Sequence, residues 1–373
     1  MKAVVVAADM ITPYGRGIDA CWAGIRAGRT AISAVSRFRT DAFHSSCAGI
    51  IPGLCYHGDQ SLVMQMLAPL LADVRAQVPA DAELILASTK GEIDLLELHI
   101  LEGRGQDTDC LLDRLLAKLV ALTGIRGESL VISAACTSSS AAVGNAAARI
   151  GAREADAVLV VACDSVTEFI YAGFSSLMAL DPDPASPFDR SRTGLNVGEA
   201  AAYALLMSDE RAHRENRPVL GTVEGWGMSD DANHMTGPSR ESEGLILAVT
   251  KALTTAGAAG KDIGFIGAHG TGTVYNDAME IRAFRSVFKN PVPVYSLKGG
   301  IGHTMGAAGL VEMLIALRAL REHSVPGTVN LQEPDQDAEG WVAREARPLA
   351  EGLRALTTNA GFSGINTALV VSA

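Results

Sequence analysis

The stretch ESLVISAACTSSSAAVGNAAARIGAREADAVLVVAC, residues 128–163, decides the fold of this chain. Its two apolar runs, at 130–132 and 157–162, are typical of buried strands, and the small-residue segment 137–152 between them predicts a helix. A strand, a helix and a second strand in this order predict a β-α-β crossover. Cys136 stands where the first strand ends and the helix begins.

The same order recurs in the C-terminal part of the chain. The sequence predicts a strand in 261–270 that ends in a glycine-rich turn, a helix in 276–288, a strand in 291–299 and a long helix with an apolar face in 306–324. Because strands and helices alternate, we expect an α/β fold whose mainly parallel sheets are covered by helices on both faces.

Polar stretches suggest how the chain divides. Residues 181–194 are polar and rich in proline, which predicts a surface excursion, and residues 208–219 are the best candidate for a hinge. We therefore predict two halves, residues 1–210 and residues 211–373.

Composition excludes several classes of protein. A chain of 373 residues with 48% hydrophobic residues can build a large core. It has no uncharged apolar run of about 18 residues and no features of a secretory signal, so we expect a cytoplasmic protein without a membrane span. The net charge of −11 argues against nonspecific nucleic-acid binding. The six cysteines form no CxxC pair, which disfavours a zinc cage or a disulfide framework.

Cys136 has two interpretations. Unpaired backbone N–H groups and the positive end of the helix dipole favour a thiolate at the start of a helix, and the thiolate is the nucleophilic form of cysteine. Thr137, Ser138 and Ser139 suit the first helical turn. In the alternative interpretation, Cys136 is a small buried hydrophobe capped by these hydroxyls, and the other strand ends must decide between the two.

Two histidines and a lysine also follow predicted strands. His269 lies in AHGTGT, where glycines let the backbone approach a ligand, but no lysine follows in the order of a phosphate-binding loop. His303 lies with Lys298 in SLKGGIGHTMGAAG, and Met305 stands where a dinucleotide fingerprint needs its third glycine. The histidines lack the spacing and the neighbouring ligands of a metal site, so we expect no metal.

A fourth loop, NAGFSGIN (359–366), carries Phe362 among glycines ahead of the last predicted strand. In parallel sheets, functional sites gather at the carboxyl ends of the strands. The loops that carry Cys136, His269, His303 and Phe362 should therefore form one site, which favours the nucleophile over the structural cysteine.

Several segments, taken in order, resemble one family. They are SAACTSSS (133–140), GFSSLMAL (173–180), PFDRSRTGLNVGEAAA (187–202), DANHMTGP (231–238), AHGTGT (268–273), SLKGGIGHTMGAAG (296–309) and GFSGIN (361–366). On these segments, which run over nearly the whole chain, the sequence resembles the elongating β-ketoacyl-acyl carrier protein synthases, or ketosynthases, of the thiolase superfamily. The segment ASTKGEIDLLE (87–97) is similar to ketosynthases of aryl polyene and other type II polyketide clusters.

The resemblance implies the five-layer αβαβα thiolase fold with two similar halves. It also implies a dimer formed through the sheet that follows the Cys136 turn, and a site whose members have distinct roles. By this likeness, the catalytic residues are Cys136, His269 and His303, and the supporting residues are Lys298 and Glu280. The N–H groups of Cys136 and Phe362 form an oxyanion hole, and Phe362 is also a gate to the acyl pocket. Thr271 and Thr273 contact the phosphopantetheine arm.

The same likeness implies an acyltransferase that joins an acyl group, held on Cys136, to malonyl-acyl carrier protein in fatty acid or polyketide elongation. Its partners would be the carrier protein and a second copy or a second ketosynthase-like subunit. It would bind no cofactor of its own, since its substrates arrive on phosphopantetheine. His303 favours elongation, because the initiating synthases resemble a Cys-His-Asn arrangement and the degradative thiolases a Cys-His-Cys one. The alternatives are an assembly or chain-length-controlling subunit of a heterodimer and, less favoured, a CoA-dependent thiolase or initiating synthase.

The chain departs from the family pattern in several places. Val274 and Asn276 replace the proline and glycine of HGTxTPxGD, so we expect a different turn before Asp277. Ser363 and Ile365 stand where glycine and threonine are common. The chain is also short between about residues 37 and 127, which bears on chain-length preference.

The expected carrier protein is acidic, so its docking surface should be locally basic. Arg190 and Arg192, in the segment PFDRSRTG, are the candidates from the sequence.

Overall fold

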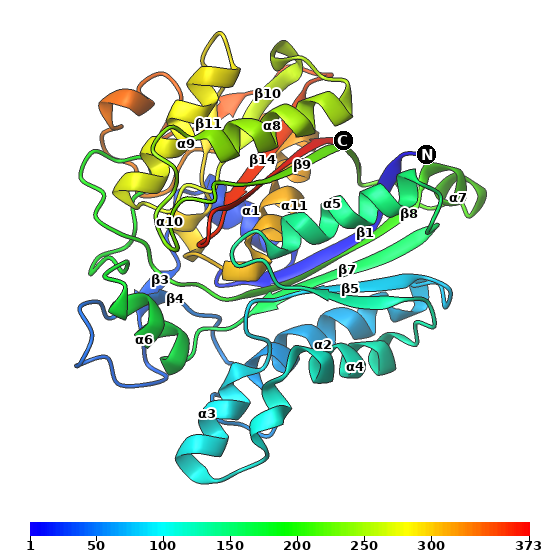
Figure 1. Cartoon of the computed structure of the whole chain (residues 1–373), viewed down its shortest axis with the longest axis vertical. Helices are drawn as coiled ribbons and strands as arrows, with labels where there is room; N and C mark the ends of the chain where they lie inside the picture. Colours follow the sequence, from blue (N-terminus) through cyan, green and yellow to red (C-terminus); the bar gives the residue numbers. More distant parts are fainter.

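The computed structural model describes residues 1–373, in which strands and helices alternate (Figure 1). The first half contains β1 (Ala3–Thr12), β2 (Gly15–Arg16), α1 (Ile18–Arg26), β3 (Ile32–Ala34), β4 (Cys47–Gly49), α2 (Leu62–Val74), β5 (Glu83–Ala87), α3 (Ile93–Glu102), α4 (Leu112–Thr123), β6 (Ser129–Ile132), α5 (Ser138–Gly151), β7 (Ala157–Asp164), α6 (Glu168–Ser176), β8 (Ala200–Ser208) and α7 (Asp209–Arg214). The second half contains β9 (Gly221–Asp230), α8 (Glu243–Ala256), β10 (Ile263–Gly267), α9 (Val274–Val287), β11 (Val294–Tyr295), α10 (Lys298–Ile301), α11 (Ala308–Arg321), β12 (Ser324–Val325), β13 (Arg347–Pro348), β14 (Arg354–Ala360) and β15 (Ile365–Ser372).

The two halves have the same strand order. The strands of the first half lie in the order β1-β8-β7-β5-β6, and those of the second half in the order β9-β15-β14-β10-β11, within one 11-stranded sheet that also includes β2. Counted along the chain, both orders read first, fifth, fourth, second, third. Corresponding neighbours also pair in the same parallel or antiparallel sense. The predicted α/β fold with two similar halves is confirmed.

The prediction of mainly parallel sheets was wrong. In the first half β5 pairs in parallel with β6 and β7, whereas β8 pairs antiparallel with both of its neighbours. The second half repeats this pattern, because β14 and β15 are joined by the short loop 361–364, and so short a connection between neighbouring strands can only join an antiparallel pair. The sheet is therefore mixed.

Helices form the remaining layers (Figure 1). The helices α5 and α11 contact strands of both halves and one another, so they lie between the two parts of the sheet. The helices α2 and α4 pack on the outer face of the first half, and α8 packs on the outer face of the second half, with α9 beside it. Within the sheet, the two halves are joined only through three residue pairs of β1 and β9, which lets the sheet fold over the central helices. These are the five predicted layers.

Small residues permit the close packing of the central layer. A Cβ atom on Gly309 of α11 would lie 2.0 Å from the Ser140 hydroxyl of α5, so no larger residue fits there without a shift. The serine-rich start of α5 therefore meets the glycine-bearing start of α11.

Two predictions about connecting segments need correction. Residues 181–194 are a surface excursion only in part: residues 182–184, 190, 191 and 193 are exposed, but Phe188 and Asp189 are buried against the second half. Residues 208–219 are not an open hinge. They contain α7, which Ser208 caps, and Arg211 of this helix forms an ion pair with Asp81. The division at 210 and 211 stays a prediction.

Candidate active site

A strained turn carries Cys136 between β6 and α5. The residue before it, Ala135, has a φ of 48°, in the left-handed region that favours glycine. The hydroxyl of Ser138 donates to the carbonyl of Ala135 at 2.6 Å and accepts the N–H of Ala134 at 2.9 Å. These bonds hold the sharp turn, and the Cys136 side chain in it is buried.

The three candidate catalytic residues meet as predicted. The thiol of Cys136 and ring nitrogens of His269 and His303 all lie within 4.8 Å of one another, and all three residues are buried. The two rings are nearly perpendicular, with centroids 5.0 Å apart. They come from the ends of β6 and β10 and from the turn after α10, so both halves contribute to the site.

Hydrogen bonds fix which nitrogen of each imidazole carries the proton. The N–H of Met305 donates to Nδ1 of His303 at 3.0 Å, and the Nδ2 amide of Asn359 lies 3.4 Å from Nδ1 of His269 as its donor. Since a neutral imidazole has one donor and one acceptor, Nδ1 accepts and Nε2 keeps its proton in both rings. The site therefore presents two Nε2–H donors.

Burial keeps the site neutral. Burial, and after it the charge of Lys298, hold the pKa of both His269 and His303 well below the ordinary range. The pKa of Cys136 is raised to about 11 by burial, although Lys298 and the backbone N–H groups of Phe362 and of Cys136 itself act in the opposite direction. Loss of water therefore outweighs the helix start and the nearby cation, which both favour the thiolate.

Lys298 forms a buried ion pair behind the histidines. Its Nζ lies 2.5 Å from Oε1 of Glu312 and also donates to the backbone carbonyl of His269. The amide of Asn359 donates to the other carboxylate oxygen of Glu312 at 2.6 Å. The ammonium is thus held near all three candidate catalytic residues. A thiol and two imidazoles can ligate zinc, but this ammonium disfavours a second cation beside it.

Replacing Lys298 should expose the cost of the unpaired carboxylate. We expect Lys298→Met to lower the free energy of unfolding by about 3–5 kcal/mol, because Glu312 stays buried without its partner. It should also raise the pKa of the Cys136 thiol, measured from the pH dependence of its alkylation by iodoacetamide, since the cation favours the thiolate. The double variant Lys298→Met/Glu312→Leu is the control in urea unfolding. If it is no more stable than the single variant, the buried charge is not the cause.

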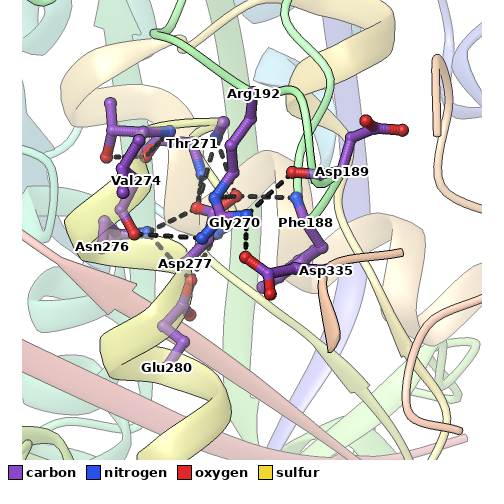
Figure 2. A network of polar contacts seen from close by, with 12 residues as sticks. Phe188, Asp189, Arg192, Gly270, Thr271, Val274, Asn276, Asp277, Glu280 and Asp335 are labelled. Carbon is purple, nitrogen blue, oxygen red and sulfur yellow. Dashed lines mark hydrogen bonds and ion pairs between the residues drawn. The ribbon is translucent and has the colours of Figure 1, made fainter. Parts of the chain in front are cut away.

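Glu280 supports the site through the backbone. Its Oε1 accepts the N–H of His269 at 2.8 Å and its Oε2 accepts the N–H of Gly270 at 2.6 Å. The carboxylate of Asp277, one turn earlier in α9, accepts the N–H groups of Thr271 and Gly272 (Figure 2). Glu280 therefore positions the turn that carries His269 and contacts no reacting atom.

Two aromatic side chains, Phe174 and Phe362, lie in a row that begins at His303. Phe362 belongs to the loop between β14 and β15, and its ring centroid is 5.9 Å from that of Phe174 in α6, which is itself 6.5 Å from the His303 ring. A Cβ atom on Gly361 would lie 3.5 Å from the backbone nitrogen of Cys136, so this loop packs directly on the Cys136 turn.

Thr271 and Thr273 lie at the end of the same turn. Their hydroxyl oxygens are 2.9 Å apart and share a hydrogen bond, and Thr271 is buried. The pair stands beside His269 in the chain, at the start of α9.

Sequence reasoning missed four residues of the site. Glu312 is the one acidic residue of α11, and a lone carboxylate in an apolar helix could have marked it. Asn359 and Phe174 carried no such signal. The buried Asp164 accepts the N–H of Gly306 at 2.7 Å and so fixes the loop after His303, and its position at the end of a buried strand was the available clue.

Of the two arginines expected to meet a carrier protein, Arg192 is buried. It donates to Asp335 at 2.5 Å and to the backbone carbonyls of Asp189 and Val274, so its charge is used inside the protein (Figure 2). Arg190 is exposed and forms an ion pair with Glu333 at 2.6 Å. The expectation for Arg192 was wrong, because Asp335 comes close to it only in the folded chain.

Comparison with known proteins gives the family. The N-terminal domain of the beta-ketoacyl synthases matches residues 108–212, and the C-terminal domain matches residues 220–332. The 3-oxoacyl-[acyl-carrier-protein] synthase 2 of Vibrio cholerae serotype O1 is 29% identical over 406 residues, covering 99% of this chain and 98% of that protein. The putative polyketide beta-ketoacyl synthase 1 of Streptomyces halstedii is 30% identical over 413 residues, covering 100% of this chain and 98% of that protein.

A solved structure agrees with these matches. The ishigamide ketosynthase/chain length factor is 26% identical, with a TM-score of 0.87, and the match covers 100% of this chain and 98% of that one. Three observations agree: the identity of 30% over the whole chain, the two domain matches, and the cysteine with two histidines in the repeated fold. This chain belongs to the beta-ketoacyl synthase family.

Proposed function

We propose that this protein is a β-ketoacyl-acyl carrier protein synthase, which condenses an acyl group held on Cys136 with malonyl-acyl carrier protein. One observation carries the proposal: the Cys136 thiol lies within 4.8 Å of two neutral imidazoles, each fixed with Nε2–H as a donor. Two neutral donors beside a nucleophile suit a reaction whose negative charge appears on oxygen.

The first step is acyl transfer. The sulfur of Cys136 attacks the thioester carbonyl of acyl-carrier protein, and the N–H groups of Cys136 and Phe362 bind the oxyanion that forms. The loop of Phe362 packs on the Cys136 turn, where a Cβ atom on Gly361 would lie 3.5 Å from the Cys136 nitrogen, and this supports the placement of the two N–H groups. The bond to the carrier sulfur then breaks, and the proton of the Cys136 thiol ends on the released phosphopantetheine thiol.

The second step is decarboxylative condensation. Malonyl thioester binds with its carbonyl oxygen toward the Nε2–H groups of His269 and His303, which stabilise the enolate as carbon dioxide leaves. The enolate carbon attacks the acyl group on Cys136, so a carbon–carbon bond forms and the carbon–sulfur bond breaks. The Cys136 thiolate takes a proton from solvent, and the β-ketoacyl group stays on the carrier protein.

The substrates come on the phosphopantetheine arm of the carrier protein, and the enzyme needs no cofactor of its own. Thr271 and Thr273 are the proposed contacts of that arm, because they stand next to His269 with hydroxyls that bond to each other and can bond to an amide. A structure of type II polyketide ketosynthase AntDE with its acyl-carrier protein AntF shares this fold, at a TM-score of 0.89. No helix of the chain has the length and apolar character that crossing a membrane requires. A cytoplasmic location stays a prediction from the sequence.

We also propose that the protein works as a dimer, with itself or with a second ketosynthase-like subunit. The strand β7, which follows the Cys136 turn, is paired on both sides, so the sheet edge expected there is not free. In the first half, the edge strand of the sheet is β6, which precedes the turn. An edge strand offers its N–H and C=O groups to another chain, so pairing through β6 would set the second subunit directly beside Cys136.

Turnover by the purified protein tests the proposal. We expect the protein alone, given acyl- and malonyl-carrier protein, to form β-ketoacyl-carrier protein, detected by its intact mass. A chain-length-controlling subunit would gain no acyl mass on Cys136, even when a second ketosynthase subunit is added and product forms. An initiating synthase or thiolase would instead accept acetyl-CoA without an acyl-carrier protein. Either result would contradict the proposed function.

A further inference from the structure

Four successive backbone N–H groups hold the turn that carries His269. Those of His269 and Gly270 donate to Glu280, at 2.8 and 2.6 Å, and those of Thr271 and Gly272 donate to Asp277, at 3.0 and 3.2 Å. Both carboxylates project from the first turns of α9 (Figure 2). The whole turn thus depends on two buried acceptors that lie side by side.

Asn276 lies between these carboxylates. Its Nδ2 amide is 3.2 Å from Oδ1 of Asp277 and 3.1 Å from Oε2 of Glu280, and it donates to both (Figure 2). An amide nitrogen carries two hydrogens, so one neutral group can satisfy both carboxylates at once. Glycine, which the resemblance leads one to expect at this position, could give no such bond.

The two carboxylates have unequal support from cations. Arg192 faces Asp277, with its Nε 3.8 Å from Oδ2. Lys298 forms no ion pair with Glu280, because its ammonium group is paired with Glu312 and bonded to the His269 carbonyl. The Thr358 hydroxyl donates to Glu280 at 2.9 Å, and His269 beside it is neutral. Burial and the charge of Asp277 raise the pKa of Glu280 to about 7. Two carboxylates so close together repel one another, and a hydrogen-bond donor between them reduces this repulsion.

We infer that Asn276 is a positioning residue for His269: its carboxamide bridges Glu280 and Asp277, and so keeps both able to accept the four N–H groups of the turn. Asn276 contacts no reacting atom and acts through these carboxylates. The inference rests on the proposed function only for its activity readout. It also gives a role to Asn276, which departs from the family pattern. The turn lacks the usual proline and glycine, and side-chain hydrogen bonds hold it instead.

The isosteric variant Asn276→Asp tests the bridge, because it keeps the shape and replaces the donor with a third carboxyl. At low pH the new group is protonated and can still donate one hydrogen bond. The new carboxyl group lies among like charges, so its pKa is raised in the folded protein. Between the pKa of the unfolded chain and that of the folded protein, the folded state holds a proton that the unfolded state has lost. Stability must then fall as pH rises through that window. We expect the Tm gap between variant and wild type to widen by at least about 4 °C between pH 6 and pH 8.5.

Activity gives the second readout. The ratio of variant to wild-type kcat for malonyl-carrier protein decarboxylation should fall about tenfold between pH 6.5 and 8.5, as the turn with His269 loses its support. Asn276→Gly removes the bridge without adding charge, so its kcat should be lower at every pH. The exposed Asn290→Asp is the matched control and should change neither quantity.

The outcomes are distinct. A Tm gap and a kcat ratio that do not change with pH in Asn276→Asp would overturn the inference, as would an Asn276→Gly variant with wild-type kcat. If the wild type decarboxylates no malonyl-carrier protein, the proposed function fails instead. The Tm comparison then still decides whether Asn276 bridges the carboxylates, because it needs no substrate.

Discussion

Cys136→Ala should form no acyl-enzyme and should lose at least about a thousandfold in condensation rate, because no other group in the site can hold the acyl chain covalently. Incubation of the wild type with acyl-carrier protein should add the acyl mass to the peptide that contains Cys136. The same peptide of the variant should stay unmodified by mass spectrometry. The methyl group fits the space of the thiol, so folding should be retained.

The buried Cys163→Ala is the matched control, since this cysteine lies inside β7 and faces no histidine of the site. Its acylation should equal that of the wild type. Acyl mass on another peptide of the Cys136→Ala variant would show that the nucleophile lies elsewhere, and the proposed mechanism would then be wrong.

His303→Ala should separate the two half-reactions. The Nε2–H of His303 is proposed to stabilise the enolate, so its loss should lower malonyl decarboxylation about 100- to 1,000-fold, as the loss of one oxyanion donor does elsewhere. Acyl transfer to Cys136 needs the backbone N–H groups of Cys136 and Phe362 instead, so the acyl mass should still appear on the protein. Both quantities can be measured in one sample, from released carbon dioxide and from protein mass.

His303→Gln serves as the conservative comparison, because its amide can donate one hydrogen bond toward the same space. It should recover part of the decarboxylation that the alanine variant loses. A His303→Ala variant that decarboxylates malonyl-carrier protein at the wild-type rate would contradict the role assigned to the second histidine.

The layered fold and the meeting of the site residues were predictable because both follow from order along the chain. Alternating strands and helices define an α/β fold, and residues at the carboxyl ends of neighbouring strands come together at one edge. Cys136, His269 and His303 each follow such a strand or the helix after it, so their closeness in space could be predicted from the sequence. The mixed direction of the sheet was not predictable in this way, because an apolar strand reads the same in either direction.

The serines after Cys136 show where sequence reasoning ends. They fit helix caps by residue type, yet α5 has no side-chain cap at its N-terminus. Ser139 instead accepts the N–H of Leu310 in α11, and Ser140 donates to Asn359 in β14. These partners are more than 170 residues away in the chain. A hydroxyl bonds to whichever group the fold brings near, and its residue type does not identify that group.

By itself, the sequence determined the class of fold and the residues that could do the chemistry, because periodicity and strand ends are local properties, while the two similar halves followed from the family resemblance. Only the tertiary structure decided their protonation and their support. Burial raises the pKa of the Cys136 thiol, which its place at a helix start alone would lower. The burial of Arg192 against Asp335 likewise depends on the distance between segments far apart in sequence. The partners of Lys298 and Asn276 lie close to them in the chain, but the strength of these contacts depends on burial, which the fold sets.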